Sequence, residues 1–118
     1  MVVFLCPPFL VFQTARRVNK KYLNKFYNKN VRIVGKVLKK EEGQLTLQTC
    51  DNEEVKCFLS ENQGEGKLDQ YVEVLGKVNK DDTLSDIVYV QNGGNSLNLN
   101  EMNNLINLTF LEEFGEIF

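Results

Sequence analysis

Two stretches of the chain share an outline that constrains the fold more than any other feature. Residues 31–37 read Val-Arg-Ile-Val-Gly-Lys-Val, and residues 72–78 read Val-Glu-Val-Leu-Gly-Lys-Val, with a glycine at the same place in each. Their β-branched residues predict strands. A glycine inside such a strand usually marks a bulge or a sharp bend. Bends of this kind allow a short sheet to close into a barrel.

Three further segments complete the predicted sheet. Residues 44–49 and 55–59 alternate polar and apolar side chains, and the polar residues 51–54 between them predict a turn. A last strand is expected over residues 83–91, although its apolar residues fall on both faces and leave its inward side open. Five short strands, two of them bent at a glycine, predict an all-β core: a five-stranded Greek-key barrel of the OB-fold type.

Segments of helical periodicity flank the predicted barrel. Before the first strand, residues 16–29 predict one or two helical turns that close one end of the barrel, with Asn19 as a possible cap. The apolar residues at helical spacing there are Val18, Tyr22, Leu23 and Phe26. After the last strand, residues 97–114 predict a longer helix that ends before Gly115.

The predicted C-terminal helix is apolar on two sides. One side carries Leu99, Met102, Ile106, Phe110 and Phe114. The other side carries Leu105, Leu108 and Leu111. A small barrel can bury only one of these sides, so we expect the helix to bind another protein, with all eight residues as candidate partner contacts. The alternative is that the second group is exposed or covers the N-terminal arm.

The N-terminal segment differs in character from the rest of the chain. Residues 1–12 are apolar, but they are too few to span a membrane and contain Pro7 and Pro8. Basic residues follow this segment, whereas a signal peptide carries its charge in front. We expect residues 1–15 to form a flexible or partner-ordered arm and residues 16–118 to form a single domain with its C-terminal helix.

The residue inventory argues against several functions. Histidine, the commonest acid–base catalyst at neutral pH, is absent from the sequence, so we assign no catalytic residue and expect no enzyme. Cys6, Cys50 and Cys57 form no C-x-x-C pair, which favours buried reduced thiols over a metal site. No phosphate-binding loop or dinucleotide glycine pattern is present, so no cofactor is expected.

A nucleic-acid surface is predicted to be weak. The net charge of -2 and the pI near 5.2 argue against tight binding of a polyanion by this chain alone. OB-folds bind single strands across their second and third strands and the adjoining loops. The candidates on that surface are Lys39, Lys40, Lys56 and Phe58. The neighbouring Asp81 and Asp82 would repel phosphate, so we expect any nucleic-acid role to be shared with partners.

The chain from about Arg17 to Phe118 resembles the smallest subunit of replication protein A, the eukaryotic heterotrimer that coats single-stranded DNA. The resemblance lies in RVNKKYLNKFYNKNVRIVGKV at residues 17–37, YVEVLGKV at 71–78, YVQ at 89–91 and the closing helix with its phenylalanines. In the first stretch the residues that match the family pattern are Arg17, Asn19, Leu23, Phe26, Val34, Gly35 and Lys36. The apolar segment before Ala15 departs from the family.

The resemblance implies a non-catalytic scaffold subunit of a nuclear, heterotrimeric single-stranded-DNA-binding complex that serves DNA replication, repair and recombination. Its C-terminal helix would join helices of the middle and large OB-fold subunits in a three-helix bundle, and those partners would supply most of the DNA affinity. Two alternatives stay open. The chain could be the small OB subunit of a telomere-capping or telomerase-associated trimer, or an autonomous OB domain that binds single-stranded DNA or RNA.

Overall fold

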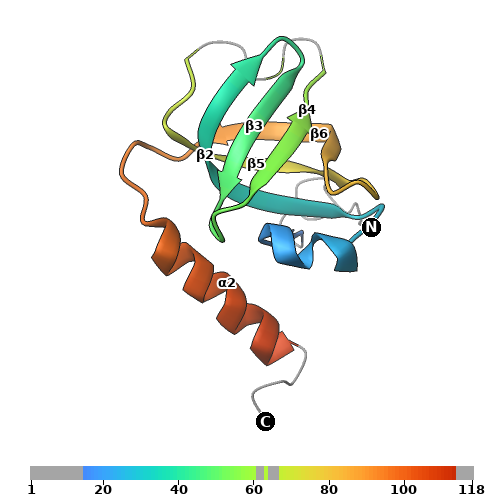
Figure 1. Cartoon of the computed structure of the whole chain (residues 1–118), viewed down its shortest axis with the longest axis vertical. Coiled ribbons are helices and arrows are strands. Elements are labelled where there is room, and N and C mark those ends of the chain that lie inside the picture. Colours follow the sequence, from blue (N-terminus) through green and yellow to red (C-terminus); the bar gives the residue numbers. More distant parts are fainter. Residues whose placement is uncertain (1–14, 61–62, 64–66, 114–118) are drawn as a thin grey trace, which may run out of the picture.

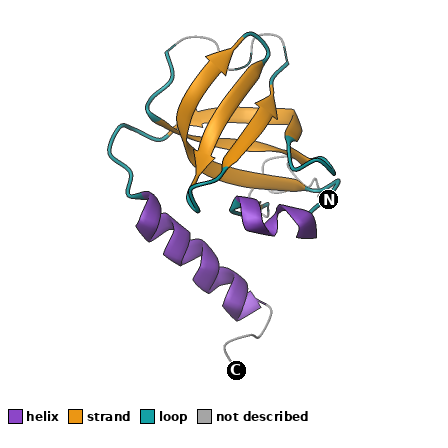
Figure 2. Ribbon diagram, viewed as in Figure 1, coloured by secondary structure: helices purple, strands orange, loops and turns teal. Residues whose placement is uncertain are grey.

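Six strands, a 3-10 helix and one long α-helix make up the structure, a computed structural model that describes residues 15–60, 63 and 67–113 (Figure 1). In chain order the elements are β1 (Arg16–Arg17), the 3-10 helix η1 (Lys20–Lys25), β2 (Asn30–Glu41), β3 (Gln44–Thr49), β4 (Glu54–Phe58), β5 (Tyr71–Val78), β6 (Leu84–Asn92) and α2 (Leu99–Glu113). Figure 2 shows the strands wrapped around one another, with both helices beyond one end of the sheet.

The sheet closes because β2 is long enough to pair with two neighbours. Its residues 30–36 pair antiparallel with β5, and its residues 35–41 pair antiparallel with β3. From β3 the order of hydrogen-bonded strands continues through β4 and β6 and returns to β5. A single parallel pair, Cys57 and Leu84, joins β4 to β6. This is a five-stranded Greek-key barrel, so the predicted OB-fold is confirmed.

The remaining segments lie outside the five predicted strands. The short strand β1, which pairs parallel with β2, was not expected, because two residues are too few to show a periodicity. Between β4 and β5, the described residues Ser60, Gln63 and Lys67 belong to no helix or strand. Of the predicted arm, residues 1–14 lie outside the described residues, and Ala15 is buried.

Gly35 lies where β2 changes partner. It pairs with both Thr49 on β3 and Val72 on β5. A Cβ atom at this position would lie 2.6 Å from the main-chain oxygen of Gln48, closer than non-bonded atoms approach. The register shift on β2 comes later, between Val37 and Lys39. Glycine is therefore required at residue 35 by the close crossing of β3 over β2 rather than by a bulge.

Gly76 coincides with a bulge, as predicted. The ladder between β5 and β6 shifts between Leu75 and Lys77. A Cβ atom at Gly76 would meet Cδ1 of Ile87 and would lie 3.1 Å from the main-chain oxygen of Ser85. The bulge therefore packs a β6 side chain against the bare backbone of β5.

The same irregularity resolves which side of β6 faces the core. Leu84 and Ile87 are both buried, although residues three apart in a regular strand face opposite sides. Asp86 between them has φ 49°, in the left-handed region, and the ladder shift occurs across it. The side-chain alternation therefore changes phase at Asp86, which explains why the apolar residues of this strand fall on both faces.

Aliphatic side chains fill the barrel, and Leu23 of η1 is also fully buried in this core. The fully buried residues of the five barrel strands include Val31, Ile33, Leu45, Leu47, Val55, Cys57, Val72, Val74, Val78 and Leu84. Burial raises the pKa of the Cys57 thiol to about 12, and burial with the nearby Asp51 charge raises that of Cys50 to about 11. Both thiols are free and buried, as predicted, and stay protonated at neutral pH.

The close crossing at Gly35 makes a stability prediction. We expect Gly35→Ala to lower the free energy of unfolding by about 1–3 kcal/mol, because the added methyl group meets backbone that cannot move aside. The control is Gly93→Ala, where a Cβ atom would meet its nearest neighbour at an ordinary 3.4 Å. Urea unfolding followed by circular dichroism measures both. Equal stabilities of the two variants would contradict this account of β2.

Candidate docking helix and nucleic-acid surface

The 3-10 helix η1 is held in place from a distant part of the chain. The backbone N–H groups of Lys20 and Lys21 donate to the carboxylate of Asp51 at 3.4 and 3.2 Å. Asn19, the predicted cap, has extended backbone angles but its side chain makes no capping hydrogen bond. Asp51 follows β3 in the turn before β4, so only the closed barrel brings its carboxylate to η1. Local sequence reasoning had no signal for this contact.

Two side-chain hydrogen bonds join η1 and its flank to α2. The Asn19 amide donates from Nδ2 to Oδ1 of Asn103. The Tyr22 hydroxyl donates to Oδ1 of Asn107 at 2.6 Å. The two acceptors are four residues apart and therefore lie on one face of the helix. These contacts define which side of α2 faces the domain.

An aromatic cluster lies beside these hydrogen bonds. The Phe110 ring stacks on Tyr22 with centroids 3.9 Å apart and an interplanar angle of 6°. Phe26 meets the same ring edge-on at 5.9 Å, and the Arg16 guanidinium lies 4.5 Å from its centroid. Phe110 is 2% exposed, and Ile106 one turn earlier is 3% exposed. Of the two apolar sides of α2, the one that carries these two residues therefore packs against the domain.

The other side of α2 faces outward. Leu105 and Leu108 are 60% and 47% exposed. Leu99 and Met102 are half-buried against the core, whereas the side chains of Leu111 and Phe114 lie outside the described part of the chain. Both apolar sides of this helix were predicted to be candidate partner contacts. The structure separates them, because Ile106 and Phe110 are occupied within their own chain.

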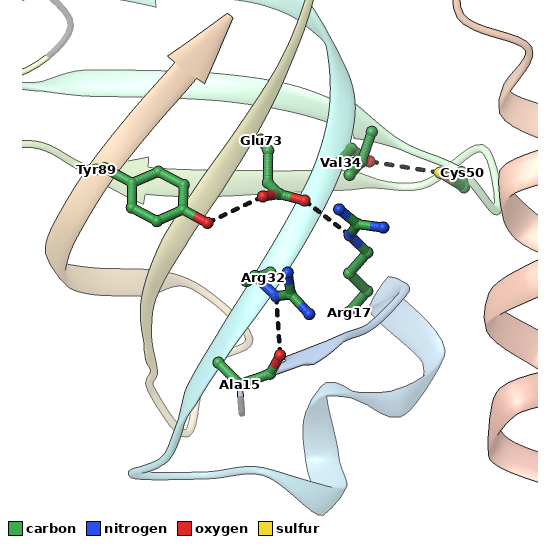
Figure 3. Close-up of polar contacts among 7 residues, drawn as sticks. All are labelled: Ala15, Arg17, Arg32, Val34, Cys50, Glu73 and Tyr89. Atoms are coloured by element: carbon green, nitrogen blue, oxygen red, sulfur yellow. Dashed lines mark hydrogen bonds and ion pairs between the residues drawn. The ribbon is translucent and has the colours of Figure 1, made fainter. Parts of the chain in front are cut away.

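A cleft of about 360 Å³ opens beside Leu105, between α2 and the first two strands. Its lining residues are Ala15, Arg16, Arg17, Arg32, Met102, Leu105, Ile106 and Thr109, and we call it the arginine cleft. Figure 3 shows two of its arginines with their partners. Arg17 Nε lies 2.8 Å from Oε2 of Glu73, and Arg32 Nε donates to the Ala15 carbonyl oxygen at 2.8 Å. Sequence reasoning missed this cleft because it depends on β1.

The strand register shows which of the predicted nucleic-acid-binding residues share one face of the sheet. Lys39 and Lys56 both pair with Thr46, and together they form one row across three strands. Phe58, 42% exposed, follows on the same face of β4, two residues after Lys56. Lys40 pairs with the buried Leu45 and therefore belongs to the opposite face. The structure thus brings together three of the four predicted residues and separates Lys40 from them.

The charges around this face limit its attraction for phosphate. Glu41 lies 3.6 Å from the Lys39 ammonium and offsets part of its charge. Of the two predicted repelling residues, Asp81 accepts a hydrogen bond from Thr83 at 2.6 Å, and Asp82 accepts one from Tyr27 at 3.0 Å. Both carboxylates therefore have polar partners within the fold. The face carries one lysine row and one exposed aromatic ring.

Across residues 15–60, 63 and 67–113, no group of three or more His, Cys, Asp or Glu side chains is placed to hold a metal ion. The described helices include none with the length and apolar character needed to cross a bilayer.

The barrel and its two-sided helix define an OB-fold domain with an appended C-terminal helix. The family model described as Replication factor A protein 3 matches residues 12–118. The chain therefore belongs to the Replication factor A protein 3 family, as its resemblance suggested. No curated protein sequence matches the chain.

Solved structures share this fold. A chain from the structure of U. maydis Replication protein A bound to ssDNA matches with a TM-score of 0.75 and 24% identity, over 85% of this chain and 94% of that chain. Telomere capping protein Ten1 from Saccharomyces pombe matches with a TM-score of 0.68 and 14% identity, over 81% and 97%. A chain of the S. pombe Stn1-ten1 complex matches with a TM-score of 0.67 and 14% identity, over 81% and 91%.

The aromatic cluster predicts a measurable coupling between η1 and α2. We expect Phe110→Ala to destabilise the domain by about 3–5 kcal/mol, because it removes a buried ring. A double-mutant cycle with Tyr22→Ala should give a coupling of about 0.5–1.5 kcal/mol from the stacked pair. Leu108→Ala on the outward side is the control and should change stability by less than about 0.5 kcal/mol. Similar losses for Phe110→Ala and Leu108→Ala would show that α2 is not docked on η1.

Proposed function

We propose that this chain is the non-catalytic small scaffold subunit of a heterotrimeric single-stranded-DNA-binding complex of the replication protein A type. It acts in the nucleus in DNA replication, repair and recombination, and it assembles with a middle and a large OB-fold subunit through α2. One observation carries the proposal: Ile106 and Phe110 anchor one side of α2, while Leu105 and Leu108 on the opposite side are exposed.

The exposed leucines suit a helical partner. Burying a leucine side chain stabilises an association by about 1.5–3 kcal/mol. Because η1 already holds α2, less conformational freedom is lost when another helix packs on it. The sequence assigns Leu111, three positions after Leu108, to the same apolar side. Leu99 and Met102, both half-buried, would flank it.

The comparisons support an assembly role. The family match covers nearly the whole chain, and one structural neighbour belongs to a Replication protein A bound to ssDNA. The likeness to Ten1, alone and within the Stn1-ten1 complex, supports the alternative of a small subunit in a telomere-capping or telomerase-associated trimer. Both proposals assign partner binding to the same outward face of α2, so the identity of the captured subunits distinguishes them.

The docking face is tested by adding charge to it. We expect a tagged Leu105→Asp/Leu108→Asp variant to lose both larger subunits in a pull-down from the native source, because two buried carboxylates would oppose helix packing. Quantitative mass spectrometry of the captured proteins measures the loss. The matched control is Ser60→Asp/Gln70→Asp, which adds the same charge at exposed positions of the barrel outside α2. Full retention of the larger subunits by the leucine variant would reject this docking face.

A second proposal concerns DNA: most affinity for single strands belongs to the larger subunits. The row formed by Lys39 and Lys56, with Phe58 beside it, offers the isolated chain two cations and one ring. Such a surface supports weak binding whose strength depends on a few ion contacts. An autonomous binder of DNA or RNA is the rival, and it requires more contacts than this face provides.

Salt dependence separates these two possibilities. Single strands release about 0.7 counterion per neutralised phosphate, so two lysines predict a slope of about −1.4 for log affinity against log salt concentration. Lys56→Ala should reduce the magnitude of this slope to about 0.7, whereas Lys40→Ala, on the opposite face, should leave it unchanged. Fluorescence anisotropy with labelled oligo-dT measures both. Sub-micromolar binding with a steeper slope would favour the autonomous binder.

A further inference from the structure

The arginine cleft has chemically different sides. Arg17 and Arg32 belong to strands β1 and β2, whereas Met102, Leu105 and Ile106 belong to α2. Arginine is the only charged residue type in its described lining. A ligand that fills this cleft must therefore present a negative charge to the strands and an apolar surface to the helix.

The two strand arginines keep hydrogen-bond donors for such a ligand. A guanidinium has five N–H donors in a rigid fork. The contacts recorded within the described part of the chain use Nε of Arg17 and Nε of Arg32, and the Arg17 side chain is 46% exposed. The terminal nitrogens of both side chains can therefore donate to another acceptor. A carboxylate matches this fork because it can accept two parallel hydrogen bonds.

Glu73 holds Arg17 without filling the cleft. One of its oxygens contacts Arg17 Nε at 2.8 Å, and the other accepts the Tyr89 hydroxyl at 2.9 Å, as Figure 3 shows. Glu73 is outside the lining of the cleft and offsets the charge of one arginine. With both carboxylate oxygens engaged, Glu73 fixes the Arg17 side chain beside a cleft that stays positively charged.

We propose that the arginine cleft receives an Asp or Glu side chain from an amphipathic helix of a larger subunit, next to the apolar residues that pack on Leu105. This inference rests on the proposed function, and Leu105 connects the two surfaces because it lines the cleft and belongs to the exposed side of α2. The apolar residues of α2 favour a protein carboxylate over a nucleic-acid phosphate. An ion pair in this cleft determines which partner binds and in which helix register, and it adds less to the binding affinity.

A cross-linking experiment on the assembled complex tests the carboxylate. Each of Arg17→Lys and Arg32→Lys keeps the positive charge and places a primary amine in a cleft whose described lining contains no lysine. The variants are co-expressed with both larger subunits, and the purified complexes are treated with a carbodiimide, which joins an amine directly to a carboxylate with loss of water. We expect mass spectrometry to find residue 17 or 32 joined to an Asp or Glu in a helical segment of a larger subunit. The wild-type complex is the control and should give no such product.

Other outcomes overturn the inference in distinguishable ways. In the first, the leucine variant Leu105→Asp/Leu108→Asp disrupts the complex, but the introduced lysine couples only to Glu73 of its own chain or to nothing. This result would reject a partner carboxylate in the cleft and would leave the proposed docking face standing. A complex that the leucine variant does not disrupt would reject the proposed function itself. A charge-reversed Arg32→Glu complex that keeps both larger subunits but loses at least tenfold in oligo-dT affinity would assign the cleft to phosphate.

Discussion

The stacking of Tyr22 on Phe110 is the interaction on which the arrangement of this protein depends. Residues 93–98 connect the last strand to α2, and this connection alone would not fix the orientation of the helix. The stacked rings, with the hydrogen bond from Tyr22 to Asn107, fix both the position and the rotation of the helix. Because that side is occupied, Leu105 and Leu108 remain exposed on the rest of the helix surface.

This contact is itself supported by the barrel. The Asp51 carboxylate, in the turn before β4, accepts hydrogen bonds from the backbone at the start of η1. A change in the packing of the β3–β4 turn would therefore reach α2 through η1. The barrel, η1 and α2 form a chain of contacts, and the proposed docking face and the arginine cleft lie at its end. A scaffold subunit needs this kind of rigidity, since its helix must be presented to partners in one orientation.

The charge distribution agrees with a division of labour inside the proposed complex. The net charge is -2, and the barrel face that carries Lys39, Lys56 and Phe58 has too few cations for tight binding of a polyanion. The cluster of Arg16, Arg17 and Arg32 lies instead beside the helix. Under our proposals, cations of this chain serve assembly more than DNA binding, and DNA affinity is a property of the whole complex.

The sequence by itself determined the elements whose causes are local. β-Branched residues predicted the strands at 31–37 and 72–78, alternating side chains predicted those at 44–49 and 55–59, and helical spacing predicted a C-terminal helix with two apolar sides. A glycine in each of the first two strands indicated a bulge or a bend, and the bulge lies in residues 72–78. The tertiary structure decided the rest. Four features depend on strand register or on contacts between distant segments. They are the hydrogen bonds from η1 to Asp51, the change in side-chain alternation at Asp86, the separation of Lys40 from the other predicted lysines, and the arginine cleft. Such contacts leave no periodic trace in the chain, because the barrel must close before these groups meet.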